Sequence, residues 1–141
     1  MAVIAVYSVK GGVGKTTTAV DLAWRCASIG GHETLLWDLD AQASASWLLG
    51  HDPPEGSYAA GVFQRDGKPE RMIIPTAYPG LSLLPGDNSL RDLPVQLARL
   101  GHGRRLAQLT RALGQRYTRI VLDCPPMINQ VSDQIIAAAD V

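Results

Sequence analysis

The apolar residues of this chain fall into short, unbroken runs. Residues 2–9 read AVIAVYSV, residues 33–40 read ETLLWDLD, and residues 119–123 read RIVLD. Runs of this length without polar alternation are typical of strands buried on both faces of a parallel sheet. The first run leads into glycines, and the other two end in carboxylates. The pattern therefore predicts three buried strands that deliver chemically active residues at their carboxyl ends.

Between the first two runs, residues 16–28 carry apolar side chains at helical spacing, and two glycines follow as a C-terminal cap. A strand–helix–strand unit of this kind requires a parallel sheet with a right-handed crossover. Farther along, the sequence predicts strands at 72–76 and 81–86, helices at 89–100, 103–117 and 131–139, and loops with one short helix at 50–71. The predicted fold class is α/β, with helices flanking a mostly parallel sheet.

Length and composition fit one globular domain spanning residues 1–141. Apolar residues make up 46% and charged residues 18% of the 141 positions, and the formal net charge is zero. Zero net charge excludes a global electrostatic argument for nucleic acid. The alternation of elements calls for another strand after the last predicted helix, so we expect the C-terminal part of this domain to be missing. The N-terminus has no basic region before its apolar run, which favours a cytoplasmic protein.

A glycine-rich loop with a lysine at its end joins the first strand to the first helix. Gly14, Lys15 and Thr16 match the end of the phosphate-loop pattern G-x-x-x-x-G-K-[ST], although Val9 stands where the pattern begins with glycine. Exposed backbone N–H groups and the positive end of the helix suit phosphate. Lys15 would neutralise the β- and γ-phosphates, and Thr16 would ligate Mg²⁺. The predicted nucleotide-binding residues are Lys10, Gly11, Gly12, Val13, Gly14, Lys15, Thr16 and Thr17.

Three aspartates follow the predicted strands. Asp38 and Asp40 close the second run, and Asp123 closes the third as a Walker B pattern, in which consecutive apolar residues lead into a carboxylate. Side chains alternate along a strand, so the first two carboxylates share a site only if the strand ends between them. We expect Asp38 and Asp123 to serve the metal ion together with Thr16, and Asp40 to act on the attacking water.

Four segments carry a resemblance to a known family. They read KGGVGKTT, LLWDLDAQASAS, IIPTAYPGLSLLPG and IVLDCPP, in that order along the chain. Together they resemble the ParA/MinD family of deviant Walker A ATPases, and DLDAQ is similar to the ParA (Soj-like) partition branch. The resemblance implies a P-loop NTPase-type three-layer fold, ATP and Mg²⁺ as cofactors, and an ATP-dependent homodimer. It also implies that Lys10 reaches across the dimer to the partner's ATP phosphates, so that Lys10, Lys15 and Asp40 are the expected catalytic residues.

The function implied by the resemblance is an ATPase switch for partitioning plasmid or chromosomal DNA. The ATP-bound dimer would bind nonspecific DNA, and a ParB-like protein would stimulate slow hydrolysis of ATP to ADP and phosphate. Such a protein is cytoplasmic and nucleoid-associated, and no membrane is expected. Two alternatives stay open: a MinD-like membrane-associated positioning ATPase, and an ATP-gated interaction protein with little hydrolysis.

Some positions depart from the family pattern or carry no clear motif. Ala41 and Ala43 replace the usual proline and glycine, and MINQ at 127–130 replaces the common Ser-Leu-Gly. The stretch 99–119 contains six arginines, and residues 93–122 contain no acid, so this segment is either a solvated face or a contact for DNA phosphates. Cys124 is interpreted as a buried structural thiol. The three tryptophans are interpreted as core or interface packing residues.

Overall fold

A computed structural model of the chain describes residues 1–101 and 103–141 and contains a five-stranded sheet. The strands, in their order across the sheet, are β1 (Ala2–Val6), β5 (Arg119–Asp123), β2 (Thr34–Asp38), β4 (Leu81–Leu84) and β3 (Ile74–Pro75). The first four pair in parallel, and β3 pairs antiparallel to β4 at one edge. The predicted mostly parallel sheet is confirmed.

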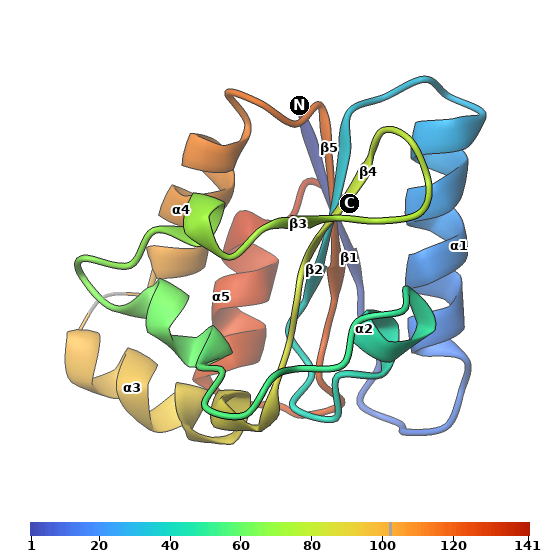
Figure 1. Ribbon diagram of the computed structural model, residues 1–141. Coiled ribbons are helices and arrows are strands. Elements are labelled where there is room, and N and C mark those ends of the chain that lie inside the picture. Colours follow the sequence, from blue (N-terminus) through green and yellow to red (C-terminus); the bar gives the residue numbers. More distant parts are fainter. Residues whose placement is uncertain (102) are drawn as a thin grey trace.

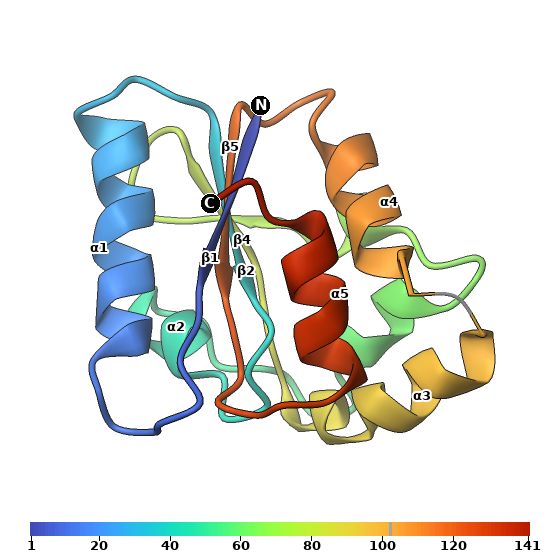
Figure 2. The same cartoon turned by 180° about the vertical axis from the view of Figure 1, so that it is seen from behind.

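Helices cover both faces of the sheet, as Figure 1 and the view from behind in Figure 2 show. One face carries α1 (Lys15–Ser28) and α2 (Ser44–Leu48); the other carries α3 (Leu93–Leu100), α4 (Arg105–Leu113) and α5 (Gln130–Ala138). Short 3₁₀ helices lie at Ala59–Phe63, Pro69–Arg71 and Asn88–Asp92. This arrangement confirms the three-layer α/β fold.

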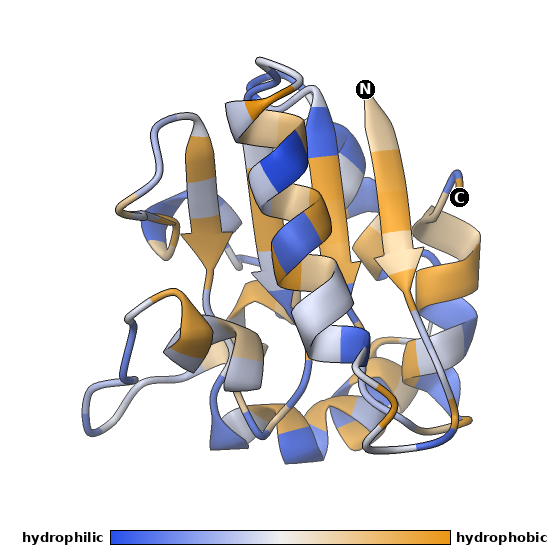
Figure 3. Ribbon diagram, turned by 90° about the vertical axis from the view of Figure 1, so that its right-hand side faces the viewer, coloured by the Kyte–Doolittle hydropathy of each residue, from blue (hydrophilic) through white to orange (hydrophobic). Residues whose placement is uncertain are grey.

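Small residues let α1 lie close to the sheet. Ala19, Ala23 and Ala27 are spaced four residues apart and are all buried against the strands. Figure 3 shows the same helix with polar residues on its outer face, in front of strands that are mainly hydrophobic. The close contact fixes the start of α1, and with it the loop that precedes the helix.

The core on the other side of the sheet contains Trp37, which stacks on Phe63 with 5.6 Å between ring centroids. The interpretation of Trp37 as a packing residue is confirmed. Trp24 is half-buried, whereas Trp47 on α2 is 71% exposed. Trp47 therefore belongs to the surface.

Several elements are shorter than their patterns predict. β1 ends at Val6 because the chain leaves the sheet to form the glycine-rich loop, and β2 ends at Asp38. The helix predicted over 89–100 is divided, because a 3₁₀ turn runs to Asp92 before Pro94 opens α3. The helix α2 was not predicted.

The carboxyl ends of the parallel strands meet at one edge of the sheet. Val6 and Asp38 both lie in register with Asp123, so the loop after β1 and the two aspartates come together there. Along the outer edge of β1, the backbone N–H groups of Asp140 and Ala5 donate to the carbonyls of Val3 and Val141, both at 2.8 Å. Among the described residues, no helix is long and apolar enough to cross a membrane.

Candidate functional site

The loop between β1 and α1 presents its backbone openly. Gly12 and Gly14 have φ values of 69° and 82°, in the left-handed region that glycine adopts without strain. A Cβ built on Gly11, Gly12 or Gly14 would have no heavy atom of the protein within 4 Å, so a ligand can approach the backbone here. The Gly14 carbonyl accepts the first helical hydrogen bond, from Thr18 at 2.9 Å. The loop therefore aims free N–H groups and the positive end of α1 at the same space.

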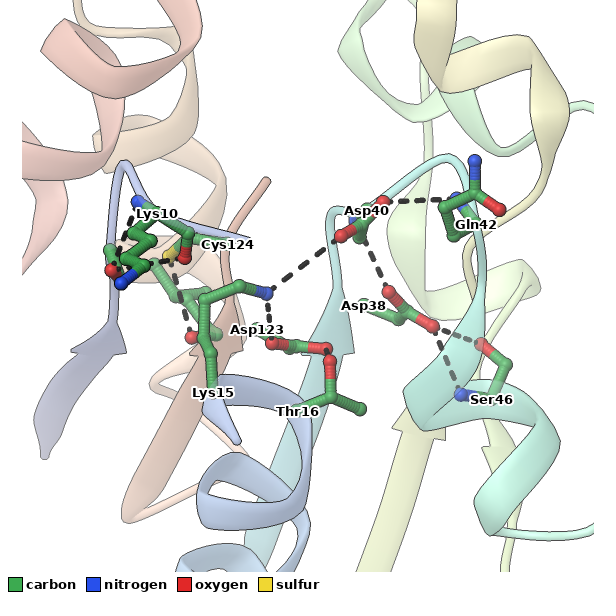
Figure 4. A network of polar contacts seen from close by, with 11 residues as sticks. Lys10, Lys15, Thr16, Asp38, Asp40, Gln42, Ser46, Asp123 and Cys124 are labelled. Atoms are coloured by element: carbon green, nitrogen blue, oxygen red, sulfur yellow. Dashed lines mark hydrogen bonds and ion pairs between the residues drawn. The ribbon is translucent and has the colours of Figure 1, made fainter. Parts of the chain in front are cut away.

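Lys15 lies between two carboxylates. Its Nζ is 2.9 Å from Oδ1 of Asp123 and 3.7 Å from Oδ2 of Asp40 (Figure 4). The lysine side chain is 8% exposed and that of Asp123 is fully buried. The loop, β5 and the end of β2 thus contribute to one charged cluster, made of the residues that the sequence assigns to the phosphates, the metal ion and the attacking water.

The second oxygen of Asp123 accepts a hydrogen bond from Thr16 Oγ1 at 2.9 Å. A hydroxyl and a carboxylate oxygen side by side form a donor set that suits Mg²⁺, which takes few protein ligands and completes its shell with water and phosphate oxygens. No group of three or more His, Cys, Asp or Glu suited to a metal occurs in the described parts of the chain. These residues therefore fit a magnesium ion bound together with phosphate better than an all-protein metal site.

Asp38 faces a different partner. Its Oδ2 accepts hydrogen bonds from the Ser46 hydroxyl at 2.7 Å and the Ser46 N–H at 2.9 Å, and its Oδ1 accepts from the Asp40 N–H at 3.1 Å. Burial raises the pKa of Asp38 to about 6, although the hydrogen bonds from Ser46 act in the opposite direction. The structure joins Thr16 to Asp123 and turns the carboxylate of Asp38 toward Ser46. Sequence reasoning missed Ser46, because a serine eight residues after an aspartate forms no recognisable motif.

A cavity of about 830 Å³ opens beside these groups. Its wall includes the glycine-rich loop, Asp40, Trp47 and Leu48. Lys10 also lines the cavity and is exposed; its backbone N–H donates to Ser8 Oγ at 3.2 Å, and its ammonium forms no ion pair with any described residue. The volume of the cavity lies within the range of small-molecule sites.

Cys124 follows Asp123 and is completely buried. Burial raises the pKa of its thiol to about 12, and the negative charge of Asp123 acts in the same direction. The interpretation of Cys124 as a buried structural thiol is confirmed.

Comparison with known proteins agrees with this geometry. A family model described as an AAA domain matches residues 1–141. A putative replication protein A of Sinorhizobium fredii is 34% identical over 152 residues, covering 97% of this chain and 37% of that protein. The chromosome partitioning protein ParA of Caulobacter vibrioides is 34% identical over 143 residues, covering 98% of this chain and 53% of that protein.

A solved structure with the same fold is that of cobyrinic acid a,c-diamide synthase from Mycobacterium smegmatis, with a bound ATP analogue and magnesium. It is 30% identical, its TM-score is 0.89, and the match covers 99% of this chain and 55% of that protein. The chain thus spans about half the length of this protein and of the Caulobacter relative. The match to the family model along the whole chain, together with partition proteins among its relatives, shows that this chain belongs to the ParA family of P-loop NTPases.

Proposed function

We propose that the protein is an ATPase switch that binds ATP with Mg²⁺, dimerises around it, and takes part in DNA partitioning. The observation that carries the proposal is the meeting of Lys15, Thr16, Asp123 and Asp40 at the end of an open glycine-rich loop. This set contains a phosphate-binding cation, two oxygen ligands for a metal and a further carboxylate.

Each group has a distinct task in this proposal. The loop N–H groups and Lys15 bind the β- and γ-phosphates. Thr16 and Asp123 hold magnesium, whose positive charge offsets the negative charge of the phosphates. Asp40, at 16% exposure of its side chain, is placed to orient the attacking water. The magnesium and ATP analogue bound by the mycobacterial relative support ATP and Mg²⁺ as the cofactors in this proposal.

Exposed apolar side chains beside the cavity support a dimer that closes over the nucleotide. Val13, Trp47 and Leu48 are 51%, 71% and 48% exposed, and all three line the cavity. A second copy of the chain would cover this apolar surface. Lys10, which has no ionic partner among the described residues, would then reach the phosphates bound by the other subunit.

Five of the six arginines of the 99–119 stretch fall into two groups in the structure, and the sixth, Arg99, is exposed in the last turn of α3. Three of the five contact protein groups. Arg105 donates to two backbone carbonyls, those of Phe63 and Gln64. The Arg116 guanidinium lies over the Tyr117 ring, and Arg119 contacts the Thr118 carbonyl and the His32 ring. Arg104 and Arg111, in contrast, are exposed and line a hollow of about 390 Å³ on α4 and α5. We propose that these two arginines contact DNA phosphates, and that a ParB-like partner stimulates hydrolysis.

The first test is the mass of the intact protein in solution, measured by light scattering with ADP and with ATP–Mg²⁺. ATP should double the mass of the parent, of Asp40→Ala, and of the matched surface control Lys68→Ala. Lys10→Ala should stay monomeric, because it lacks the cation that reaches the partner's phosphates. Normal dimerisation of Lys10→Ala, or no dimer in any variant, contradicts the switch.

The DNA and hydrolysis steps are tested on the same dimer. Binding to nonspecific duplex should weaken as salt rises, and it should weaken further in Arg104→Ala and Arg111→Ala but not in the surface control Arg65→Ala. Binding to anionic vesicles instead of DNA would favour a membrane-positioning ATPase. ATP-dependent dimers without turnover would favour an ATP-gated interaction protein.

A further inference from the structure

Ser46 connects three separate segments at the end of the sheet. Its hydroxyl donates to Asp38 on β2, and the same oxygen accepts a hydrogen bond from the N–H of Gly86, which follows β4, at 3.0 Å. Its own N–H also donates to Asp38, from within α2. Ser46 is completely buried, so water does not compete for these contacts.

The direction of each hydrogen bond is fixed by chemistry. The Gly86 N–H can only donate, so the serine oxygen accepts there and directs its single proton to the carboxylate. Gly86 also permits this arrangement because a Cβ at this position would lie 2.9 Å from the Asp40 carbonyl oxygen and 3.0 Å from Cγ of Asp38. A side chain at 86 would therefore push apart the segments that Ser46 joins.

The same carboxylate holds the next acidic residue. The Asp40 N–H donates to Oδ1 of Asp38 at 3.1 Å, while the Asp40 carboxylate lies 3.7 Å from Lys15 Nζ. Asp40 lies beyond the end of β2, where no strand pairing fixes it. Its position therefore depends on short-range contacts, of which the one to Asp38 leads directly back to Ser46 (Figure 4).

We propose that Ser46 is a positioning residue for the phosphate site. It holds the Asp38 carboxylate with two hydrogen bonds, Asp38 fixes the backbone of Asp40, and the Asp40 carboxylate is thereby kept beside Lys15. The inference rests on the proposed ATPase activity, and it gives Asp38 a supporting task within the protein instead of direct contact with a metal. Trp47, the neighbour of Ser46 on α2, lines the cavity, so this short helix connects the cavity wall to the end of β2.

The test compares Ser46→Ala, which removes only the hydroxyl, with Ser46→Thr, which keeps it. The control is Thr110→Val, which removes a buried hydroxyl from α4, on the other face of the sheet, where it donates to Ala107. In the intact protein, Ser46→Ala should lower kcat about tenfold and leave KM for ATP within about twofold of the parent. Ser46→Thr should recover most of the lost kcat, and Thr110→Val should change neither constant.

Amide hydrogen exchange supplies a readout that does not depend on activity. In Ser46→Ala, the amides of both Gly86 and Asp40 should exchange about tenfold faster, although the Asp40 amide keeps its own acceptor. Parental exchange at Asp40, or a parental kcat in Ser46→Ala, overturns the proposal, as does an equal loss of kcat in Thr110→Val. If the parent itself hydrolyses no ATP, the proposed function fails, and exchange at Asp40 alone decides the positioning role.

An apparent Mg²⁺ affinity measurement separates the two roles considered for Asp38. With Asp38→Asn, a positioning role predicts a lower kcat at an unchanged magnesium midpoint, since Asp123 and Thr16 remain. A midpoint raised about tenfold or more would instead show that Asp38 serves the metal ion, and would overturn its assignment as a purely supporting residue.

Discussion

Ala43 provides a stability test that can be worked out from the backbone. It has a φ of 54° and is the one residue other than glycine with a positive φ in the described parts of the chain. Alanine in this left-handed region costs about 1–2 kcal/mol, which glycine avoids. Replacement by glycine also lowers stability by about 0.7 kcal/mol through the greater entropy of the unfolded chain, and it removes the methyl group of a residue that is only 8% exposed. These effects nearly cancel, so Ala43→Gly should leave the free energy of unfolding within about 0.5 kcal/mol of the parent.

Ala41, two residues earlier, is the matched control. Its φ is not positive, so Ala41→Gly incurs the entropic cost without relief of strain and should lower the free energy of unfolding by about 1 kcal/mol. Urea unfolding followed by circular dichroism measures the difference, which corresponds to about 4 °C in Tm. Equal losses in the two variants would refute the reasoning, because they would show that Ala43 carries no backbone strain.

Three further predictions concern buried groups. Because the pKa of Cys124 is raised to about 12, a thiol reagent should modify only half-buried Cys26 in the folded protein, and reaction at both cysteines before unfolding would contradict this. The pKa of Asp38, raised from 3.8 to about 6, means that the folded state holds one proton more than the unfolded state between these values. Stability should therefore fall by about 2 kcal/mol as pH rises from 4 to 6, and a titration of Tm should show this decline disappear in Asp38→Asn. The buried hydroxyl of Tyr117 has no hydrogen-bond partner among the described residues, so Tyr117→Phe should raise the free energy of unfolding by about 1 kcal/mol. Urea unfolding measures this change, and a loss of stability would instead show that the hydroxyl has a partner.

Much of the fold could be predicted from the sequence because local pattern and tertiary structure agree. The apolar runs gave the central strands, and the helical spacing of 16–28 gave α1 to within one residue. Parallel strands bring their carboxyl ends to one edge of the sheet, and this topology explains why Lys15 lies beside Asp123. No detail of side-chain packing was needed for these predictions.

The missed features depend on contacts between distant segments. The helix α2 has five residues, no side-chain cap and an N-cap residue, Ala43, in the left-handed region, so nothing local favours it. It is joined to the sheet through Ser46, whose partners Asp38 and Gly86 lie eight and forty residues away. A pattern read along the chain contains no information about such a contact.

In the proposed function, the pairing of Lys15 with Asp123 would make nucleotide binding an exchange of ionic partners. Phosphate oxygens must draw the ammonium away from a carboxylate that has no access to water, and that carboxylate then needs another positive charge. A divalent cation arriving with the phosphates meets this need, whereas free nucleotide leaves two negative groups facing each other. The salt bridge thus favours joint entry of nucleotide and cation over entry of either one alone.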